Sequence, residues 1–390
     1  MDREVLKKNA ASIKKAVLKE RDNIQSFLES LVNQNSFTFN KEGVGRVASI
    51  LSGAMPAGFS HEEVDAGERF AVHHVFSRKG SGKKPVVLIG HMDTLWKPEN
   101  PFKKMHEKGD KLIGPAVNDM KAGLAVIVWA LRALDKCGLL GEIPVMVVFN
   151  SDEEVGSVDS KKIFSGLEDI AAGLVYEGGG EGGTVVTKRV GITDYALEIE
   201  VVAAHAGLYY GPKGSALLEM AHRLIWLESL NRGRNELSVN AGIAEGGLAT
   251  NIVPGNAKCN FEIRFWDEKE LERIERLIES GIKNPVVEGC KLKFLKGKHR
   301  PPLTRGQREK ALFRLVAETA SMLNLHVAEE YRNGGSDASW LSGIGVPSID
   351  GLGPVGDLDR TEQEYILKET LFERIELTAN LLLVPGLYSV

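Results

Sequence analysis

Four groups of acidic and histidine side chains follow each other along the first half of the chain, in places where an enzyme could hold a metal ion. The groups are His91 with Asp93, Asp119, Glu153 with Glu154, and Glu177. Three of them come directly after short apolar runs of strand type, and Asp119 precedes a helical pattern. Ligands collect at the carboxyl ends of parallel strands, so these side chains are expected to converge on one point.

The spacing of the first group suits a zinc ligand and its support. Imidazole nitrogen and carboxylate oxygen are common zinc donors, and catalytic zinc usually has three protein ligands and a water. His91 can point at a metal from a strand end. Asp93 lies two residues on, on the same face, where its carboxylate can hold the other ring nitrogen.

The adjacent acids Glu153 and Glu154 are expected to divide two tasks, because neighbouring residues at a strand end point in different directions. One can ligate a metal while the other acts as a general base. Each group alone also has a structural explanation: paired glutamates often begin a helix, and Gly178-Gly179-Gly180 after Glu177 is an ordinary loop composition. Four such groups at strand ends in one domain favour the metal site.

The elements that would position these groups alternate as strand, helix and strand, which predicts a parallel α/β sheet. Expected strands are 70–76, 85–89, 144–149, 174–176 and 346–349, and expected helices are 4–31, 45–52, 119–138, 306–323 and 367–383. A loop Gly-Gly-Ser-Asp is expected at 334–337.

A different pattern begins near Val190 and indicates a separate α+β insertion with an antiparallel sheet. Its expected strands are 195–202, 238–243, 258–265 and 291–295, and its expected helices are 216–230 and 268–282. The C-terminal part then completes the first domain.

Composition places the protein among ordinary globular chains. It has 390 residues, 43% hydrophobic and 26% charged, with a formal charge of −4, which gives no sign of a nucleic-acid partner, a membrane partner or disorder. No apolar leader segment is evident, and Cys137, Cys259 and Cys290 lack paired spacing. The expected compartment is the cytoplasm.

Together these motifs resemble the cocatalytic zinc metallopeptidase family that includes glutamate carboxypeptidase, aminoacylase, tripeptidase and succinyl-diaminopimelate desuccinylase. The segments GHMDTLW, GPAVNDMKAG, SDEEVGS and YEGGG match its motifs in the expected order, and the resemblance covers nearly the whole chain. It implies a phosphorylase/aminopeptidase-like catalytic domain at 1–189 and 302–390. It also implies an inserted α+β, ferredoxin-like dimerisation or lid domain at 190–301.

The resemblance implies a role for each acidic or histidine residue. His91 and Glu177 would hold one zinc ion, Asp119 would bridge two, and Glu154 would bind the second, giving two zinc ions per chain; cobalt or manganese are alternatives. Glu153 would be the general base that passes the proton of the attacking water to the leaving amine, and Asp93 would orient His91.

For the insertion, the resemblance implies that the protein forms a homodimer. It also implies that several strands supply the side chains that bind the substrate. His205, in AAHAG, would stabilise the oxyanion in the partner's active site. Asn251 and Arg264 would bind a substrate carboxylate, with Arg189 and Arg300 added to the pocket. Alternatively, His205 is structural and Arg264 pairs with a neighbouring acid. Three residues of the 334–337 loop match a segment that lines the family's site: Gly334, Gly335 and Asp337.

One position departs from the family pattern. Members usually carry a late histidine as a ligand of the second zinc, and gapless alignment puts Arg360 there; the last histidine of the chain is His326. Arginine stays protonated and does not ligate metals at neutral pH. We expect Asp359, one residue earlier, to replace the histidine. A one-metal enzyme and a weakened second site are the alternatives.

The predicted function is metal-dependent hydrolysis of an amide or peptide bond in a small substrate with a free carboxylate, most like a glutamate carboxypeptidase. An N-acyl-amino-acid deacylase is the alternative, since the same chemistry cleaves either amide. The departure at Arg360 leaves a third hypothesis, a dimeric protein that binds a small molecule without hydrolysing it. Retention of Glu153, the base, argues against it.

Overall fold

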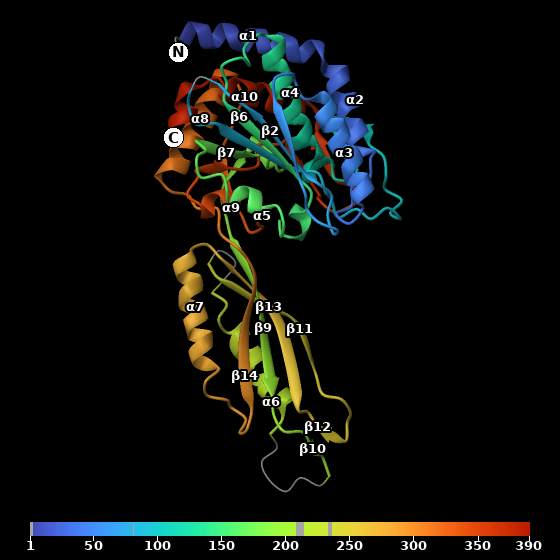
Figure 1. Ribbon diagram of the computed structural model, residues 1–390, viewed down its shortest axis with the longest axis vertical. Helices are drawn as coiled ribbons and strands as arrows, with labels where there is room; N and C mark the ends of the chain where they lie inside the picture. Colours follow the sequence, from blue (N-terminus) through green and yellow to red (C-terminus); the bar gives the residue numbers. More distant parts are fainter. Residues whose placement is uncertain (1–2, 81, 208–213, 233–235) are drawn as a thin grey trace. The chain divides into compact units, whose positions relative to one another are not determined.

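The computed structural model describes residues 3–80, 82–207, 214–232 and 236–390, which form two compact units (Figure 1). Unit 1 comprises Met1–Lys188, Arg305–Arg332 and Ser336–Val390. Unit 2 comprises Arg189–Thr304 with Asn333–Gly335. Unit 2 is thus an insertion in the chain of unit 1.

A six-stranded mixed sheet forms the centre of unit 1, in the order β1-β2-β6-β3-β7-β16. Its strands are β1 (Ser60–Val64), β2 (His73–Arg78), β3 (Val86–His91), β6 (Val145–Asn150), β7 (Ala172–Val175) and β16 (Ser348–Ile349). β3 is parallel to β6 and β7, and every residue of β3 is buried, as its apolar sequence predicts for a central parallel strand. His91 pairs with Asn150, so β3 and β6 end at the same level.

Helices cover this sheet, and α4 and α10 pack side by side while α1, α2 and α3 contact α4 (Figure 1). The helices of unit 1 are α1 (Arg3–Lys19), α2 (Arg21–Val32), α3 (Lys41–Ala54), α4 (Ala122–Lys136), α5 (Lys161–Phe164), α8 (Gln307–Met322), α9 (Ala338–Gly343) and α10 (Lys368–Leu381). The helix predicted at 4–31 is two helices broken at Glu20. Val17 before the break and Ile24 after it are both buried, so each helix turns its own apolar face to the core.

A small four-stranded sheet, β17-β18-β5-β4, was not expected from the sequence. Its strands are two or three residues long: β4 (His106–Lys108), β5 (Lys111–Ile113), β17 (Gly356–Asp357) and β18 (Tyr365–Leu367). Such short strands carry no readable alternation of apolar and polar residues. By pairing β18 with β5, the sheet brings the late part of the chain to the segment that precedes Asp119. Another short pair joins β8 (Val185–Arg189) to β15 (Glu329–Arg332).

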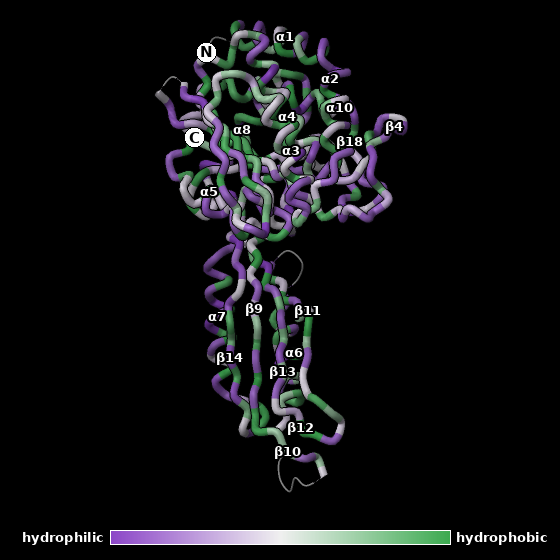
Figure 2. Tube along the Cα trace, turned by 45° about the vertical axis from the view of Figure 1, so that its right-hand side comes forward, coloured by the Kyte–Doolittle hydropathy of each residue, from purple (hydrophilic) through white to green (hydrophobic). Residues whose placement is uncertain are grey.

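Unit 2 is an antiparallel sheet, β11-β13-β9-β14, with helices α6 and α7. The elements are β9 (Gly191–Glu200), α6 (Ala216–Glu228), β11 (Ser238–Gly246), β13 (Asn256–Phe265), α7 (Glu268–Gly281) and β14 (Lys291–Arg300), with the short pair β10 (Ala204–His205) and β12 (Ile252–Val253). Hydrophilic and hydrophobic residues alternate along these strands (Figure 2). Tyr195, Leu197 and Ile199 of β9 therefore face the core of unit 2.

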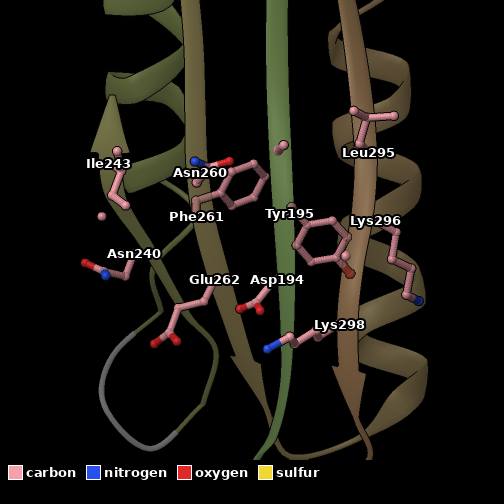
Figure 3. Close-up of a pocket in the computed structure, with 13 residues that line it drawn as sticks. Asp194, Tyr195, Asn240, Ile243, Asn260, Phe261, Glu262, Leu295, Lys296 and Lys298 are labelled. Carbon is pink, nitrogen blue, oxygen red and sulfur yellow. The ribbon is translucent and has the colours of Figure 1, made fainter. Parts of the chain in front are cut away.

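A hollow of about 490 Å³ lies on the sheet of unit 2, over strands β9, β11, β13 and β14 (Figure 3). Asp194, Asn260, Glu262 and Lys298 line it. None of the residues that the sequence assigns to catalysis or metal binding does so. This hollow is therefore not the predicted metal site. None of the helices in the described part of the chain is both long and apolar enough to cross a membrane.

The histidine pair on strands β1 and β2 predicts how the stability of unit 1 depends on pH. His61 Nε2 lies 2.9 Å from His74 Nδ1, and His74 is only 8% exposed. Burial, followed by the nearby His61, lowers the pKa of His74 to about 4 from 6.5. Between pH 6.5 and 4 the unfolded chain binds the extra proton, so stability present above pH 6.5 is lost as the pH falls.

We expect His74→Gln to remove this part of the acid sensitivity. The free energy of unfolding in urea should fall less steeply in the variant between pH 7 and 4, by at most about 3 kcal/mol over the range. Other titrating groups, including His73, are present in both proteins and cancel in the difference. Parallel profiles for the two proteins would contradict the prediction.

Candidate metal centre

Three side chains from separate segments of unit 1 meet beyond the carboxyl ends of β3 and β7. His91 ends β3, Asp119 lies in the turn that precedes α4, and Glu177 follows β7. His91 Nε2 is 3.1 Å from Asp119 Oδ1 and 3.5 Å from Glu177 Oε1. One donor atom of each residue lies within 4.8 Å of the other two, which is close enough for one ion.

The hydrogen bond at the other nitrogen of His91 leaves the ring in the form that binds metals. Nδ1 lies 2.9 Å from the carbonyl oxygen of Asp93, and that oxygen can only accept. Nδ1 therefore carries a hydrogen, and Nε2 faces Asp119 and Glu177, where its lone pair would be offered to a bound ion. The Asp93 carboxylate, to which the sequence assigned this contact, has its Oδ1 3.6 Å from Nδ1, an ion-pair distance rather than a hydrogen bond.

The carboxylate of Asp93 instead holds the turn that carries the two glutamates. It accepts hydrogen bonds from the backbone N–H of Glu153 at 3.1 Å and of Glu154 at 3.3 Å, and from the hydroxyl of Thr38 at 2.8 Å. It is fully buried, and burial raises its pKa to about 6. Asp93 thus links His91 to the Glu153–Val155 turn, where the residue Glu153 is 9% exposed.

Glu364 holds the loop of Asp119, a role that sequence reasoning missed. Its buried carboxylate accepts hydrogen bonds from the backbone N–H groups of Ala116 at 3.1 Å, Asn118 at 2.9 Å and Asp119 at 3.1 Å. Ala116 has φ 55°, a left-handed conformation that costs roughly 1–2 kcal/mol for a residue with a side chain. The three hydrogen bonds offset that cost and fix the direction of Asp119.

We expect Glu364→Gln to weaken metal binding without touching a ligand. The amide cannot accept the same N–H groups with both of its ends, so the Asp119 loop should lose its fixed conformation. Loss of such supporting contacts typically lowers metal affinity about 10- to 100-fold. Titration of zinc against a competing chelator measures the change, and Glu362→Gln, exposed and two residues away, is the control. Equal affinities in the two variants would contradict the role of Glu364.

The electrostatics of the cluster show that it suits a cation. Burial raises the pKa of Glu177 to about 7, and burial followed by the charge of Asp119 raises the pKa of Glu154 well above its ordinary value. Several buried carboxylates placed together repel one another unless a positive charge lies among them. Imidazole nitrogen and carboxylate oxygen are also zinc donors, and three protein ligands are the number found in catalytic zinc sites. The residues present therefore fit one ion at His91, Asp119 and Glu177.

The surroundings of Glu154 are different, because a guanidinium group lies there. Arg360 Nη2 is 3.1 Å from Glu154 Oε2, and Arg360 Nε is 3.9 Å from Asp119 Oδ2. Asp359, the expected substitute ligand, accepts a hydrogen bond from the amide of Asn118 at 2.6 Å instead. Arg360, rather than Asp359, thus faces Glu154 and Asp119. With the guanidinium group in this position, the residues around Glu154 do not fit a second metal ion.

The three predicted substrate arginines of unit 2 gather around the loop Asn333–Gly335. Arg264 donates to the carbonyl of Asn333 at 2.7 Å and to the carboxylate of Glu262 at 2.7 Å. Arg189 is buried and donates to the carbonyl of Gly334 at 3.0 Å. A Cβ on Gly335 would lie 2.8 Å from Cδ of Arg300. A side chain at position 335 would therefore displace the outer part of the Arg300 side chain.

The remaining predicted residues lie at other places in their units. In unit 2, Asn251 and His205 are exposed, and His205 Nδ1 accepts the backbone N–H of Gly207 at 3.2 Å. In unit 1, Asp337 is fully buried and accepts hydrogen bonds from Asn150 and Ser157. These contacts hold the strand end of β6.

Comparison with known proteins agrees with this geometry. Residues 87–384 match the peptidase family M20/M25/M40. The chain is 26% identical over 381 residues to carboxypeptidase G2 of Pseudomonas sp. (strain RS-16), covering 95% of this chain and 91% of that protein. It is 27% identical over 247 residues to acetylornithine deacetylase of Myxococcus xanthus, covering 57% of this chain and 62% of that protein.

Solved structures share the fold at lower identity. Aminopeptidase PepT from Bacillus cereus superposes with a TM-score of 0.76 and 21% identity, over 95% of this chain and 98% of its own. The Bacillus subtilis YXEP protein, described as a dinuclear metal binding peptidase, superposes with a TM-score of 0.71 and 15% identity, over 95% of this chain and 99% of its own. The predicted fold class is confirmed.

Proposed function

The chain belongs to peptidase family M20/M25/M40, a family of metal-dependent peptidases and amidohydrolases, and from that premise we propose that it acts as a glutamate carboxypeptidase. It would cleave the amide bond of a small peptide or acylated amino acid with a free carboxylate. The observation that carries this proposal is the meeting of His91, Asp119 and Glu177 beside the turn of Glu153. The relative that spans 95% of the chain is a carboxypeptidase.

Each residue of the centre then has a task. His91, Asp119 and Glu177 would hold zinc, and the ion would supply Lewis-acid chemistry to the substrate carbonyl and to the attacking water at neutral pH. Glu153 takes the proton of the attacking water and delivers it to the leaving amine. Asp93 fixes both the ring of His91 and the backbone of Glu153, so base and ligand keep one relative position.

Unit 2 supplies the groups that select the substrate. Guanidinium groups bind carboxylates in two parallel hydrogen bonds, which suits Arg264, Arg189 and Arg300 for the free carboxylate, with Asn251. The gathering of these arginines at one loop supports the assignment. We assign catalysis to residues 1–189 and 302–390 and dimerisation to residues 190–301.

A homodimer through unit 2 is part of the proposal. Leu218 and Ile225 of α6 and Ile243 of the edge strand β11 are 50%, 73% and 59% exposed. Exposed apolar side chains beside an open strand edge are typical of a protein interface. We also propose a cytoplasmic enzyme, since the three cysteines are free.

A substrate panel tests the choice of activity. We expect the zinc-loaded enzyme to cleave peptidyl-glutamate substrates with kcat/KM at least about tenfold higher than N-acetyl amino acids, because anchoring of a second group of the substrate should add to transition-state binding. The opposite preference would favour the alternative, an N-acyl-amino-acid deacylase. That alternative has partial support from the Myxococcus xanthus deacetylase, which matches 57% of this chain.

A further inference from the structure

Arg360 is the one departure from the family's ligand pattern, and its side chain lies among the acids expected to hold a second ion. We propose that its guanidinium group takes the place of that ion, so that the centre holds a single metal ion and a permanent organic cation. This inference rests on the proposed function for the identity of the first ion.

The first observation is the position of the charge. Arg360 Nη2 contacts Glu154 Oε2 at 3.1 Å, and its Nε lies 3.9 Å from Asp119 Oδ2. Glu154 and Asp119 are the two carboxylates that the family pattern gives to the second ion. A zinc ion bound to Glu154 would have to lie about 2.0–2.2 Å from one of its oxygens. It would then stand close to the guanidinium, and the two positive charges would repel each other.

The second observation is the lack of a third donor. The chain has no histidine after His326, and Asp359 Oδ1 is bonded to the amide of Asn118 at 2.6 Å. Among the described residues, the cluster of donors able to hold an ion here consists of His91, Asp119 and Glu177, without Glu154. Two carboxylates beside a cation are a poor second site.

The third observation is the backbone that aims the side chain. Leu358 and Arg360 have φ 63° and 66°, a left-handed conformation rare in residues with a side chain. Asp359 between them is held by Asn118, and the loop is bounded by β17 and β18. This backbone directs the side chain of Arg360 toward buried Glu154, whose side chain is 3% exposed. An unpaired buried carboxylate destabilises the folded chain, and Arg360 offsets this cost by pairing with Glu154.

Metal counting after substitution of this residue tests the proposal. Zinc is supplied in excess to the full-length protein at pH 7.5, unbound zinc is removed by gel filtration, and zinc per chain is measured by elemental mass spectrometry. We expect one ion in the natural protein and two in Arg360→His, which restores the missing imidazole. Histidine is among the residues that tolerate the left-handed backbone at this position. Arg360→Lys keeps the charge without adding a ligand and should bind one ion.

A second cluster must be removed for the count to be clean. His61, Glu63 and His74 have donor atoms within 4.8 Å of one another on strands β1 and β2, so they can take up zinc supplied in excess. All three proteins are therefore made with His61→Ala, which lies outside the proposed centre, and the natural protein in this count is the chain that keeps Arg360.

The outcomes separate this inference from the proposed function. Two ions in the natural protein, one ion in Arg360→His, or two in Arg360→Lys would each overturn the role of Arg360, whatever the activity. Absence of amide hydrolysis from every loaded protein would overturn the proposed function and leave the count intact. One ion in the natural protein, two in Arg360→His and one in Arg360→Lys would support the replacement of a metal ion by a guanidinium group.

Discussion

Replacement of Glu153 by glutamine should lower kcat by roughly 1,000-fold and leave zinc binding unchanged. The amide has the size of the carboxylate but cannot accept a proton, and a positioned general base contributes about 10²- to 10⁴-fold to a rate. Glu153 is not among the three residues that meet at the metal position, and its backbone N–H remains bonded to Asp93 in the variant. The substitution should thus remove the proton transfer alone.

The measurement pairs steady-state kinetics with elemental analysis of the same preparation. Glu181→Gln, an exposed glutamate in the turn after β7, is the matched control and should retain the activity of the natural protein. If Glu153→Gln keeps activity within tenfold, the general base must be another group. If it loses zinc as well, Glu153 belongs to the ligands and the division of tasks with Glu154 is wrong.

The meeting of the candidate metal ligands followed from simple rules, because apolar strands of a parallel sheet must be buried and must end together. His91 and Glu177 lie directly after two such runs, and the structure brings them to one point with Asp119. The supporting contacts did not follow. Glu364 binds Asp119 through backbone N–H groups, and the carbonyl of Asp93 fixes His91. Backbone atoms are the same in every residue, so no residue type marks their partners.

The loop of Arg360 shows a second feature that could not be predicted from the sequence, the direction of its side chains. Alignment by residue type showed that a histidine was missing, and carboxylate chemistry made Asp359 the natural substitute. The direction of each side chain depends on Leu358 and Arg360, which both have a left-handed backbone conformation. Neither is a glycine or an asparagine, the residue types that would predict such a conformation. The short strands β17 and β18 on either side of the loop could not be predicted from the sequence either. Only the structure therefore shows whether Asp359 or Arg360 faces the acids.

Replacement of His205 by alanine should lower kcat by about 100- to 1,000-fold, the usual cost of losing one oxyanion donor. Its Nδ1 accepts the backbone N–H of Gly207, so the hydrogen of the neutral ring is on Nε2 and can be donated outward. We propose that this donor serves the active site of the partner chain. An exposed histidine on a short strand has no evident task within its own unit.

Mixed dimers test the crossing directly, because the two variants damage different sites. In a dimer of His205→Ala with Glu153→Gln, one active site has an intact base from the first chain and an intact histidine from the second. Random reassociation of equal amounts should therefore restore about a quarter of the natural activity. Pairing Glu153→Gln with the double variant is the matched control and should restore none, since no chain then carries the base. A mixture no more active than its two parents would place the action of His205 within its own chain.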